Sequence, residues 1–171
     1  MRYSFAAAGA LCAALIAGSG FIAQAQEAVP EKMPFDIPYG MAVSYDKAIG
    51  AINAAAAESK KRNWKMNIAV VDNNGDLIAF QRMDGAQIAS VKIAQGKAST
   101  AARYRRETEL FFKAFESGHP YVATLDNTLV ASPGGIPLME GGKMVGAIGC
   151  SGGTGSQDEV VCRAGANAVN K

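Results

Sequence analysis

The sequence feature that most constrains the fold is a segment near the C-terminus, residues 143–159, KMVGAIGCSGGTGSQDE. It begins with an apolar run, residues 143–150, whose glycines predict a buried strand that another backbone or a ligand approaches closely. A glycine-rich stretch follows and predicts a tight loop. Ser156 and Glu159 then have the spacing of a capping box, which predicts the start of a helix.

This predicted strand, loop and helix start have two interpretations. In the first, backbone N–H groups of the loop face outward and bind an anion at the helix start, with Gly152 and Gly153 as candidate binding positions. In the second, the segment is a tight turn without a ligand. The segment contains neither G-x-x-x-x-G-K-[ST] nor G-x-G-x-x-G, so it is not a P-loop or a dinucleotide-binding fingerprint.

Composition narrows the class of protein. A chain of 171 residues that is 49% hydrophobic and 19% charged is predicted to form one globular domain with a sizeable core. Its formal net charge of +2 is too small to indicate nucleic acid or an anionic membrane as the main partner.

The first 25 residues have the pattern of a targeting segment rather than of a fold. Arg2 is followed by an uncharged apolar stretch and by Ala-Gln-Ala at residues 23–25, which together predict a secretory signal peptide. An uncleaved membrane anchor is the alternative. We therefore expect export to the periplasm or the exterior, with a mature chain that starts near Gln26 and has no membrane span.

Residues 26–43 contain Pro30, Pro34 and Pro38 and predict an extended N-terminal arm. Such an arm either lies across a neighbouring subunit or partner, or is a loose tail. The remaining residues, 44–171, are predicted to form the domain.

Cleavage of the predicted signal peptide would remove Cys12, which leaves two cysteines, Cys150 and Cys162. In an exported protein an even pair permits a disulfide, and a helix packed on its own strand could bring these two together. The alternative is two small buried hydrophobic residues.

Hydrophobic periodicity and turn residues predict five antiparallel strands flanked by helices, in one α/β (α+β) domain. Asn-Gly at residues 74–75 predicts a type I′ hairpin, and Thr108 is expected to cap a short helix. The expected helices are residues 44–63, 88–102, a short segment after Thr108, and 157–170. The expected strands are residues 66–71, 77–82, 128–131, 136–139 and 143–150.

Several side chains between the predicted strands are candidates for binding. Lys97 either faces solvent or points at an anionic ligand. Arg103 and Arg105 precede the aromatic residues Phe111 and Phe112, which belong to a core or interface or else, with the arginines, hold a flat carboxylated ligand.

His119 is the single histidine of the chain and lies close to Tyr121. It is either a surface hydrogen-bonding residue or an axial ligand to haem iron, because imidazole suits iron. A zinc site made by the protein alone is not expected, because no second histidine can join it.

Three blocks of sequence, IAVVDNNGDLIAFQRMDGA, AQGKASTAA and PGGIPLMEGGKMVGAIGCSGGTGSQDE, resemble in this order the GlcG/HbpS family, also called the haem-degrading-domain family. The resemblance implies a profilin-like fold, with a five-stranded antiparallel sheet flanked by helices on both faces, and assembly into homo-oligomers. It also implies haem binding in some members. The chain differs from the usual pattern at Cys150 and Cys162, where small apolar residues are typical, and at Gly96, where Asp is common.

The resemblance leads to the hypothesis of an exported haem-binding or haem-handling protein, non-catalytic or weakly catalytic. His119 would bind the iron, while the propionates and ring would be held by a basic, aromatic and glycine set: Lys97, Arg103, Arg105, Phe111, Phe112, Tyr121, Gly152 and Gly153. The alternative is a small accessory subunit of a periplasmic dehydrogenase or other complex, which would use the arm and the Phe-rich surface as contacts.

An enzyme is not the first expectation. The sequence has no nucleophile with a recognisable base and no paired-carboxylate motif. Asp158 and Glu159 fall in the first turn of a predicted helix, where acidic side chains favour the helix dipole, so we interpret them as structural.

Overall fold

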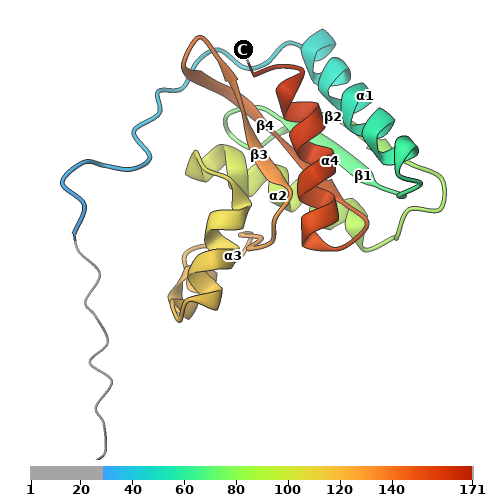
Figure 1. Ribbon diagram of the computed structural model, residues 1–171. Coiled ribbons are helices and arrows are strands. Elements are labelled where there is room, and N and C mark those ends of the chain that lie inside the picture. The colour runs from blue at the N-terminus through green and yellow to red at the C-terminus, as the bar shows by residue number, and fades with distance from the viewer. Residues whose placement is uncertain (1–28, 171) are drawn as a thin grey trace, which may run out of the picture. The chain divides into compact units, whose positions relative to one another are not determined.

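The strand predicted near the C-terminus is an inner strand of the sheet, and the other elements pack around it (Figure 1). The computed structural model describes residues 29–170, so the predicted signal peptide lies outside the described residues. Contacts place Met33–Lys171 in one compact unit and the described residues 29–32 in another. In chain order the elements are α1 (Tyr45–Lys61), β1 (Asn67–Val71), β2 (Leu77–Arg82), α2 (Ser90–Tyr104), α3 (Thr108–Glu116), the 3-10 helix η1 (Pro120–Thr124), β3 (Gly135–Glu140), β4 (Lys143–Ser151) and α4 (Gly155–Asn167).

Within the described residues the sheet has four strands in the order β2-β1-β4-β3, and each neighbouring pair is antiparallel. Ile148 of β4 lies between Val70 of β1 and Ile136 of β3. β1 is buried throughout, and β4 is buried except at Lys143. An inner strand covered on both faces needs apolar residues at successive positions, which explains the continuous apolar run in the sequence.

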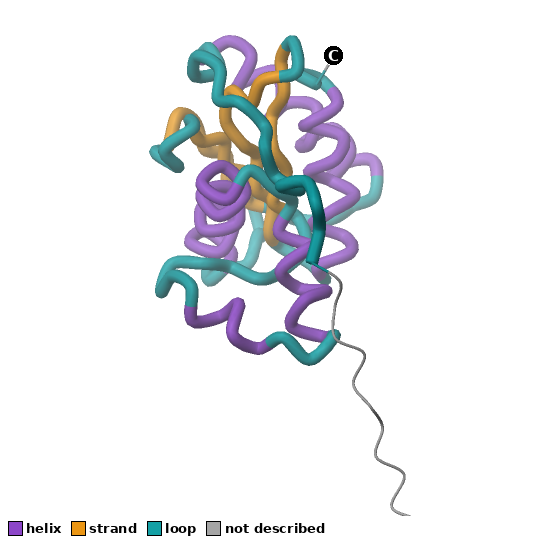
Figure 2. The backbone as a smooth tube through the Cα atoms, turned by 90° about the vertical axis from the view of Figure 1, so that its left-hand side faces the viewer, coloured by secondary structure: helices purple, strands orange, loops and turns teal. Residues whose placement is uncertain are grey.

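Helices cover both faces of the sheet, as Figure 2 shows. α1 and α4 pack against each other on one face, and α2 covers the other. Ile68 and Val70 belong to the core under α1 and α4, whereas Ala69 belongs to the core under α2, because side chains alternate along a strand. A Cβ at Gly149 would lie 2.1 Å from the carbonyl oxygen of Ala94, so this glycine lets α2 approach β4 closely. The predicted α+β arrangement with helices on both faces is confirmed.

The fifth strand predicted at residues 128–131 is wrong, because this segment is a turn followed by irregular chain. The N–H and hydroxyl groups of Thr128 donate to Oδ1 of Asp126 at 2.8 and 2.7 Å. The N–H of Val130 donates to the hydroxyl of Thr100 in α2 at 3.0 Å. Side chains therefore satisfy backbone groups that a strand would direct to a neighbour.

The hairpin between β1 and β2 forms as predicted, but its turn is not type I′. Gly75 has φ 91°, and among the described non-glycine residues only Asn63 and Arg105 have positive φ. The N–H of Gly75 donates to the carbonyl of Asp72, whose carboxylate accepts from the N–H groups of Asn74 and Asp76. The connection is thus a turn that ends in a glycine with positive φ. The Asp72 carboxylate stabilises this turn by accepting backbone hydrogen bonds, which a two-residue loop does not provide.

α1 begins where the sequence indicates. The hydroxyl of Ser44 accepts from the N–H of Lys47 at 3.4 Å, and Lys60 and Lys61 lie in the last turn. Within residues 29–170, no helix combines the length and apolar character needed to cross a membrane.

The C-terminal part of the arm is bound to the sheet of its own chain. The N–H groups of Gly40 and Val43 donate to the carbonyls of Met144 and Val145, each at 2.7 Å, and the N–H of Met144 donates to the Pro38 carbonyl at 2.9 Å. The arm runs beside the first residues of β4, which β1 does not reach. Residues 38–43 are therefore not a loose tail, and contact of the arm with a neighbouring subunit or partner stays a prediction.

Thr108 does not cap α3, contrary to the prediction. The N-cap is Glu107, and Thr108 is fully buried. Its hydroxyl donates to the carbonyl of Ser132 at 2.6 Å and accepts from the N–H of Gly135 at 2.9 Å. The side chain thus joins the start of α3 to the start of β3.

Candidate functional site

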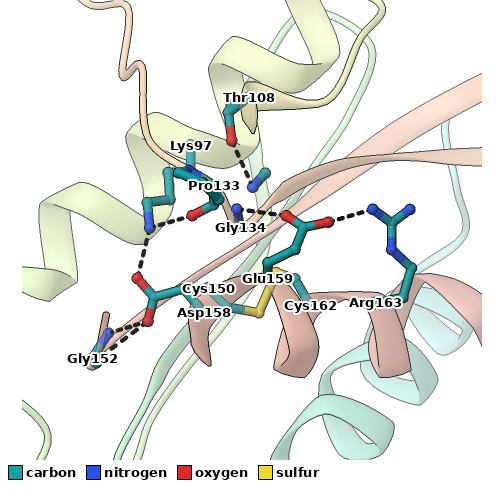
Figure 3. Close-up of a disulfide and its surroundings, with 12 residues drawn as sticks. Lys97, Thr108, Pro133, Gly134, Cys150, Gly152, Asp158, Glu159, Cys162 and Arg163 are labelled. Carbon is teal, nitrogen blue, oxygen red and sulfur yellow. Dashed lines mark hydrogen bonds and ion pairs between the residues drawn. A yellow bond between two sulfur atoms is a disulfide. The ribbon is translucent and has the colours of Figure 1, made fainter. Parts of the chain in front are cut away.

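Lys97 lies inside the domain, which neither sequence-based alternative anticipates. Its side chain is 1% exposed, and Nζ donates to Oδ2 of Asp158 and to the carbonyl of Pro133, both at 2.7 Å (Figure 3). Asp158 is 3% exposed. A buried charge needs a partner and further hydrogen bonds, and both ions have them. The ammonium group is therefore directed at a carboxylate of its own chain.

The second oxygen of Asp158 occupies the glycine corner. Its Oδ1 accepts from the N–H groups of Gly152 and Gly153, each at 3.0 Å. These two groups do not face outward, contrary to the first interpretation of the segment. The anion that the backbone stabilises is the carboxylate of Asp158, and the corner is a structural joint between β4, α4 and α2.

A disulfide closes the same joint. Cys150 at the end of β4 is bonded to Cys162 in α4, with a Cα–Cα separation of 5.5 Å (Figure 3). Both residues are fully buried. Of the two alternatives for these cysteines, a disulfide or two small buried hydrophobic residues, the structure has the disulfide.

The predicted capping box is displaced by two residues. Thr154 and Gln157 form it, and Glu159 instead accepts from the N–H of Gly134 at 2.8 Å. Glu159 also forms an ion pair with Arg163. An N-cap residue has a non-helical backbone conformation. In this chain Thr154 has that conformation, whereas Ser156 lies inside the helix.

Arg163 connects α4 to the start of α3. Its guanidinium group binds both carboxylate oxygens of Glu107, at 2.6 and 2.7 Å. These hydrogen bonds hold the pKa of Glu107 below its ordinary value. Burial raises the pKa of Glu159, against the opposing effect of Arg163.

A largely apolar cavity of about 320 Å³ lies beside this connection. Its lining comes from the arm, the start of α3, β3 and the C-terminal end: Phe35, Ile37, Arg105, Arg106, Glu107, Leu110, Ile136, Pro137, Met139 and Asn170. We call this cavity the arm pocket. An apolar lining with a few charged groups is typical of a small-molecule site.

Arg106 is the distinctive charge of the arm pocket. Its guanidinium carbon lies 3.4 Å from the ring centroid of Phe35 and 5.0 Å from that of Phe111. Nε donates to the carbonyl of Tyr104, and the terminal nitrogens have no hydrogen-bond partner among the described residues. Burial lowers the pKa of Arg106, against the opposing effects of Tyr104 and Tyr121. The group can therefore bind an anion at its free edge.

The predicted arginines occupy different places. Arg105 lines the arm pocket and donates from Nη1 to the carbonyl of Ile37 at 2.9 Å. Arg103 lies outside this pocket and is bound to Asp126 and to the Thr128 hydroxyl. The structure thus separates two residues that are close in sequence.

The predicted iron ligand and aromatic residues lie on α3 and η1. His119 is half-buried, with Nδ1 3.2 Å from the hydroxyl of Ser117, and its ring meets that of Tyr121 edge-on at 6.0 Å. Phe111 is buried against Tyr104, whereas Phe112 is 39% exposed. Within residues 29–170, no three His, Cys, Asp or Glu side chains are grouped to hold a metal ion.

Sequence reasoning missed Arg106, Phe35, Ile37 and Leu110 as lining residues. Arg106 directly follows Arg105 in the sequence, and no pattern distinguishes it from Arg103 and Arg105. The alternation of Phe35, Ile37 and Tyr39 between prolines was a usable signal for an arm that packs on the domain.

These observations define a class: a small α+β domain with a four-stranded antiparallel sheet between helical layers and an apolar pocket containing two arginines. The chain belongs to the family described as haem degrading protein HbpS-like, which matches residues 43–167. The predicted kinship is confirmed.

Relatives and solved structures agree with this assignment. Protein GlcG of Escherichia coli K12 is 38% identical over 109 residues, which are 64% of this chain and 81% of GlcG. The crystal structure of HbpS is similar with a TM-score of 0.71 at 28% identity, over 80% of this chain and 96% of that chain. The crystal structure of a PduOC–haem complex also has a TM-score of 0.71, at 25% identity, over 76% of this chain and 96% of that one.

Proposed function

We propose that this protein is an exported haem-binding or haem-handling protein of the HbpS type, non-catalytic or weakly catalytic. The arm pocket carries the proposal, because it combines an apolar lining with the guanidinium group of Arg106, whose terminal nitrogens have no hydrogen-bond partner among the described residues. The family match and the similarity to a PduOC–haem complex support it.

The residues present fit the chemistry of haem, which is a flat apolar ring with anionic propionates. The apolar side chains of β3 and α3 would contact the ring, and Arg106 with Arg105 would pair with propionate oxygens. His119 and Tyr121 carry an imidazole and a phenol, which are groups that bind haem iron in proteins, but neither residue lines the pocket. Bound haem would supply a redox-active iron.

We propose a revised residue set for haem. Lys97, Gly152 and Gly153 bind Asp158, and Arg103 binds Asp126, so these groups serve the scaffold. Phe111 supports Arg106 from the core. His119, Tyr121, Phe112 and Arg105 remain as candidates, and Arg106 joins them.

Haemin titration of the purified mature protein tests the proposal. We expect a Soret band that saturates, and Arg106→Gln should weaken binding by about tenfold, the cost of a charge-assisted hydrogen bond. Arg62→Gln is the matched control, because Arg62 also stacks on an aromatic ring, that of Trp64, outside the pocket. A spectrum that never departs from that of free haemin would contradict haem binding.

Iron ligation is tested separately. His119→Ala and Tyr121→Phe each remove one candidate ligand, and the one that binds iron should shift the Soret maximum when lost. A spectrum unchanged in both variants would remove both residues from the iron site.

Export is tested in the native host. The pattern of residues 1–25 supports it, and the N-terminal sequence of protein from the periplasm or medium should start near Gln26. Full-length protein retained in the membrane fraction would instead support an uncleaved anchor.

A second candidate function is favoured by exposed apolar side chains. An accessory subunit of a periplasmic dehydrogenase or other complex, or a homo-oligomer, would bury them. The residues with large exposed apolar surface on α3 and η1 or just after it are Leu110, Phe112, Phe115, Tyr121 and Leu125. Co-purification with a larger subunit and no bound haem would favour this function, and light scattering would measure self-association.

A further inference from the structure

The N-terminal arm supplies part of the arm pocket. Phe35 and Ile37 line it together with residues of α3 and β3. Both precede residues 43–167, which match the family. One wall of this pocket is therefore formed by a segment outside the family-matched region.

Contacts from the arm converge on the arginines that follow α2. Phe35 stacks on Arg106 at 3.4 Å, and the Ile37 carbonyl accepts from Arg105. The ring of Tyr39 lies 5.4 Å from the guanidinium carbon of Arg105, and its hydroxyl donates to the Arg103 carbonyl at 3.3 Å. These contacts place the arm at a defined position.

The backbone at the end of α2 directs both arginines toward the arm. Arg105 is the C-cap and has a left-handed conformation, with φ 53°. A non-glycine residue in this conformation is sterically disfavoured, so contacts must compensate. The hydrogen bond from Arg105 to Ile37 holds the arm to the end of α2, and the hydrogen bonds between the arm and Met144 hold the arm to β4.

The charge of Arg106 is not neutralised by its neighbour in the pocket. Glu107 is the adjacent carboxylate, but both of its oxygens are bound to Arg163. Stacking on Phe35 covers a face of the guanidinium plane, and the donor edge remains for a ligand. The remaining lining is mainly apolar.

We propose that the arm completes a binding pocket for an organic carboxylate with an apolar body, in which Arg106 binds the carboxylate and Phe35 positions Arg106. The inference rests on the proposed function, since it names the ligand class of the same pocket. A porphyrin propionate and an aliphatic acid both have this chemistry, and the ligand is held through its carboxylate and apolar body rather than through iron.

The full mature chain is titrated with metal-free protoporphyrin IX, followed by porphyrin fluorescence, and with octanoate, followed by calorimetry. Octanoate should bind and 1-octanol should bind at least about tenfold more weakly, because the alcohol lacks the charge. Saturable porphyrin binding with no octanoate binding assigns the pocket to the porphyrin source, and the converse assigns it to aliphatic acids. Equal binding of octanoate and octanol, or binding of neither acid, overturns the proposal.

Variants separate the roles of the two residues. Arg106→Gln should weaken both acids by about tenfold or more, and Phe35→Leu by about three- to tenfold, the range of a cation–π contact. Phe35→Tyr keeps the stacked ring and should restore wild-type affinity, which a purely structural role for apolar bulk would not require. Tyr45→Ala, which removes an exposed aromatic residue of α1, is the control.

The outcomes distinguish this inference from the proposed function. Haemin binding that is unchanged in Arg106→Gln and Phe35→Leu overturns the inference and leaves haem binding intact. Acid binding that depends on both residues, with no haemin binding, supports the inference and removes the haem proposal. Circular dichroism melting tests whether each variant is folded. If Arg106→Gln is not folded, Arg106→Lys, which keeps the charge without the planar fork, replaces it.

Discussion

The Lys97–Asp158 joint and the arm pocket both place cations near carboxylates, but they treat the charge differently. In the joint, ammonium and carboxylate are each nearly inaccessible, and both carboxylate oxygens have donors. In the arm pocket, Glu107 is paired with Arg163, and Arg106 keeps its terminal nitrogens without partners among the described residues. A fully satisfied charge stabilises a structure, whereas a charge with a free edge is available to a ligand.

The largest effect should come from breaking the joint. Lys97→Met leaves the Asp158 carboxylate buried without its cation and should lower the free energy of unfolding by about 3–5 kcal/mol. Urea denaturation measures this, with Lys92→Met at an exposed position of α2 as the control. A loss below about 1 kcal/mol would mean that the ion pair contributes little beyond its desolvation cost.

Removing the disulfide should have the next largest effect on stability. Replacing Cys150 and Cys162 together by Ala should cost about 2–4 kcal/mol, because the unfolded chain regains freedom over the closed loop. Denaturation of the native protein with and without a reductant gives the same comparison without mutation. Ligand affinity in the arm pocket should remain unchanged, and a parallel loss of both would show that the two regions are coupled.

The Glu107–Arg163 pair, which lies between the joint and the arm pocket, should make the folding stability depend on pH. The pKa of Glu107 is lowered in the folded state from 4.5, so its contribution is fully present above that value and is lost as pH falls through the folded pKa. Glu159 has the opposite effect, because its pKa is raised in the folded state. The folded protein therefore binds this proton more readily than the unfolded chain, and stability is gained as pH falls through the folded pKa.

Melting temperatures of wild type and Glu107→Gln should therefore differ at pH 7 and converge toward pH 3. Glu159→Gln tests the opposing contribution, because it should flatten the gain on acidification. A gap for Glu107→Gln that widens as pH falls would contradict the assigned direction.

The smallest effect on stability is expected at Arg106, despite its charge and partial burial. Arg106→Gln loses stacking on Phe35 but breaks no ion pair with a described residue, so the free energy of unfolding should change by less than about 1 kcal/mol. The same urea titration as for Lys97→Met makes the comparison direct. A loss similar to that of Lys97→Met would make Arg106 a scaffold residue.

Much of the fold was predictable because its signals are local. The apolar run of β4, the Ser44 cap of α1 and the hairpin between β1 and β2 depend on residues within a few positions of each other. The prediction of a fifth strand was wrong because side chains of Asp126 and Thr100 accept hydrogen bonds from backbone N–H groups of residues 128–131. The periodicity of these residues gives no information on such contacts.

The sequence by itself determined the helices, the four observed strands in their order and the family, and it permitted the cysteine pair without deciding it. Only the tertiary structure decided that Lys97 meets Asp158, 61 residues away, and that Arg106 meets Phe35 of the arm. Periodicity and capping act between near neighbours, whereas the partner of a charge depends on which distant segments pack together. For that reason the glycine corner became a joint, and a pocket formed where the sequence carries no motif.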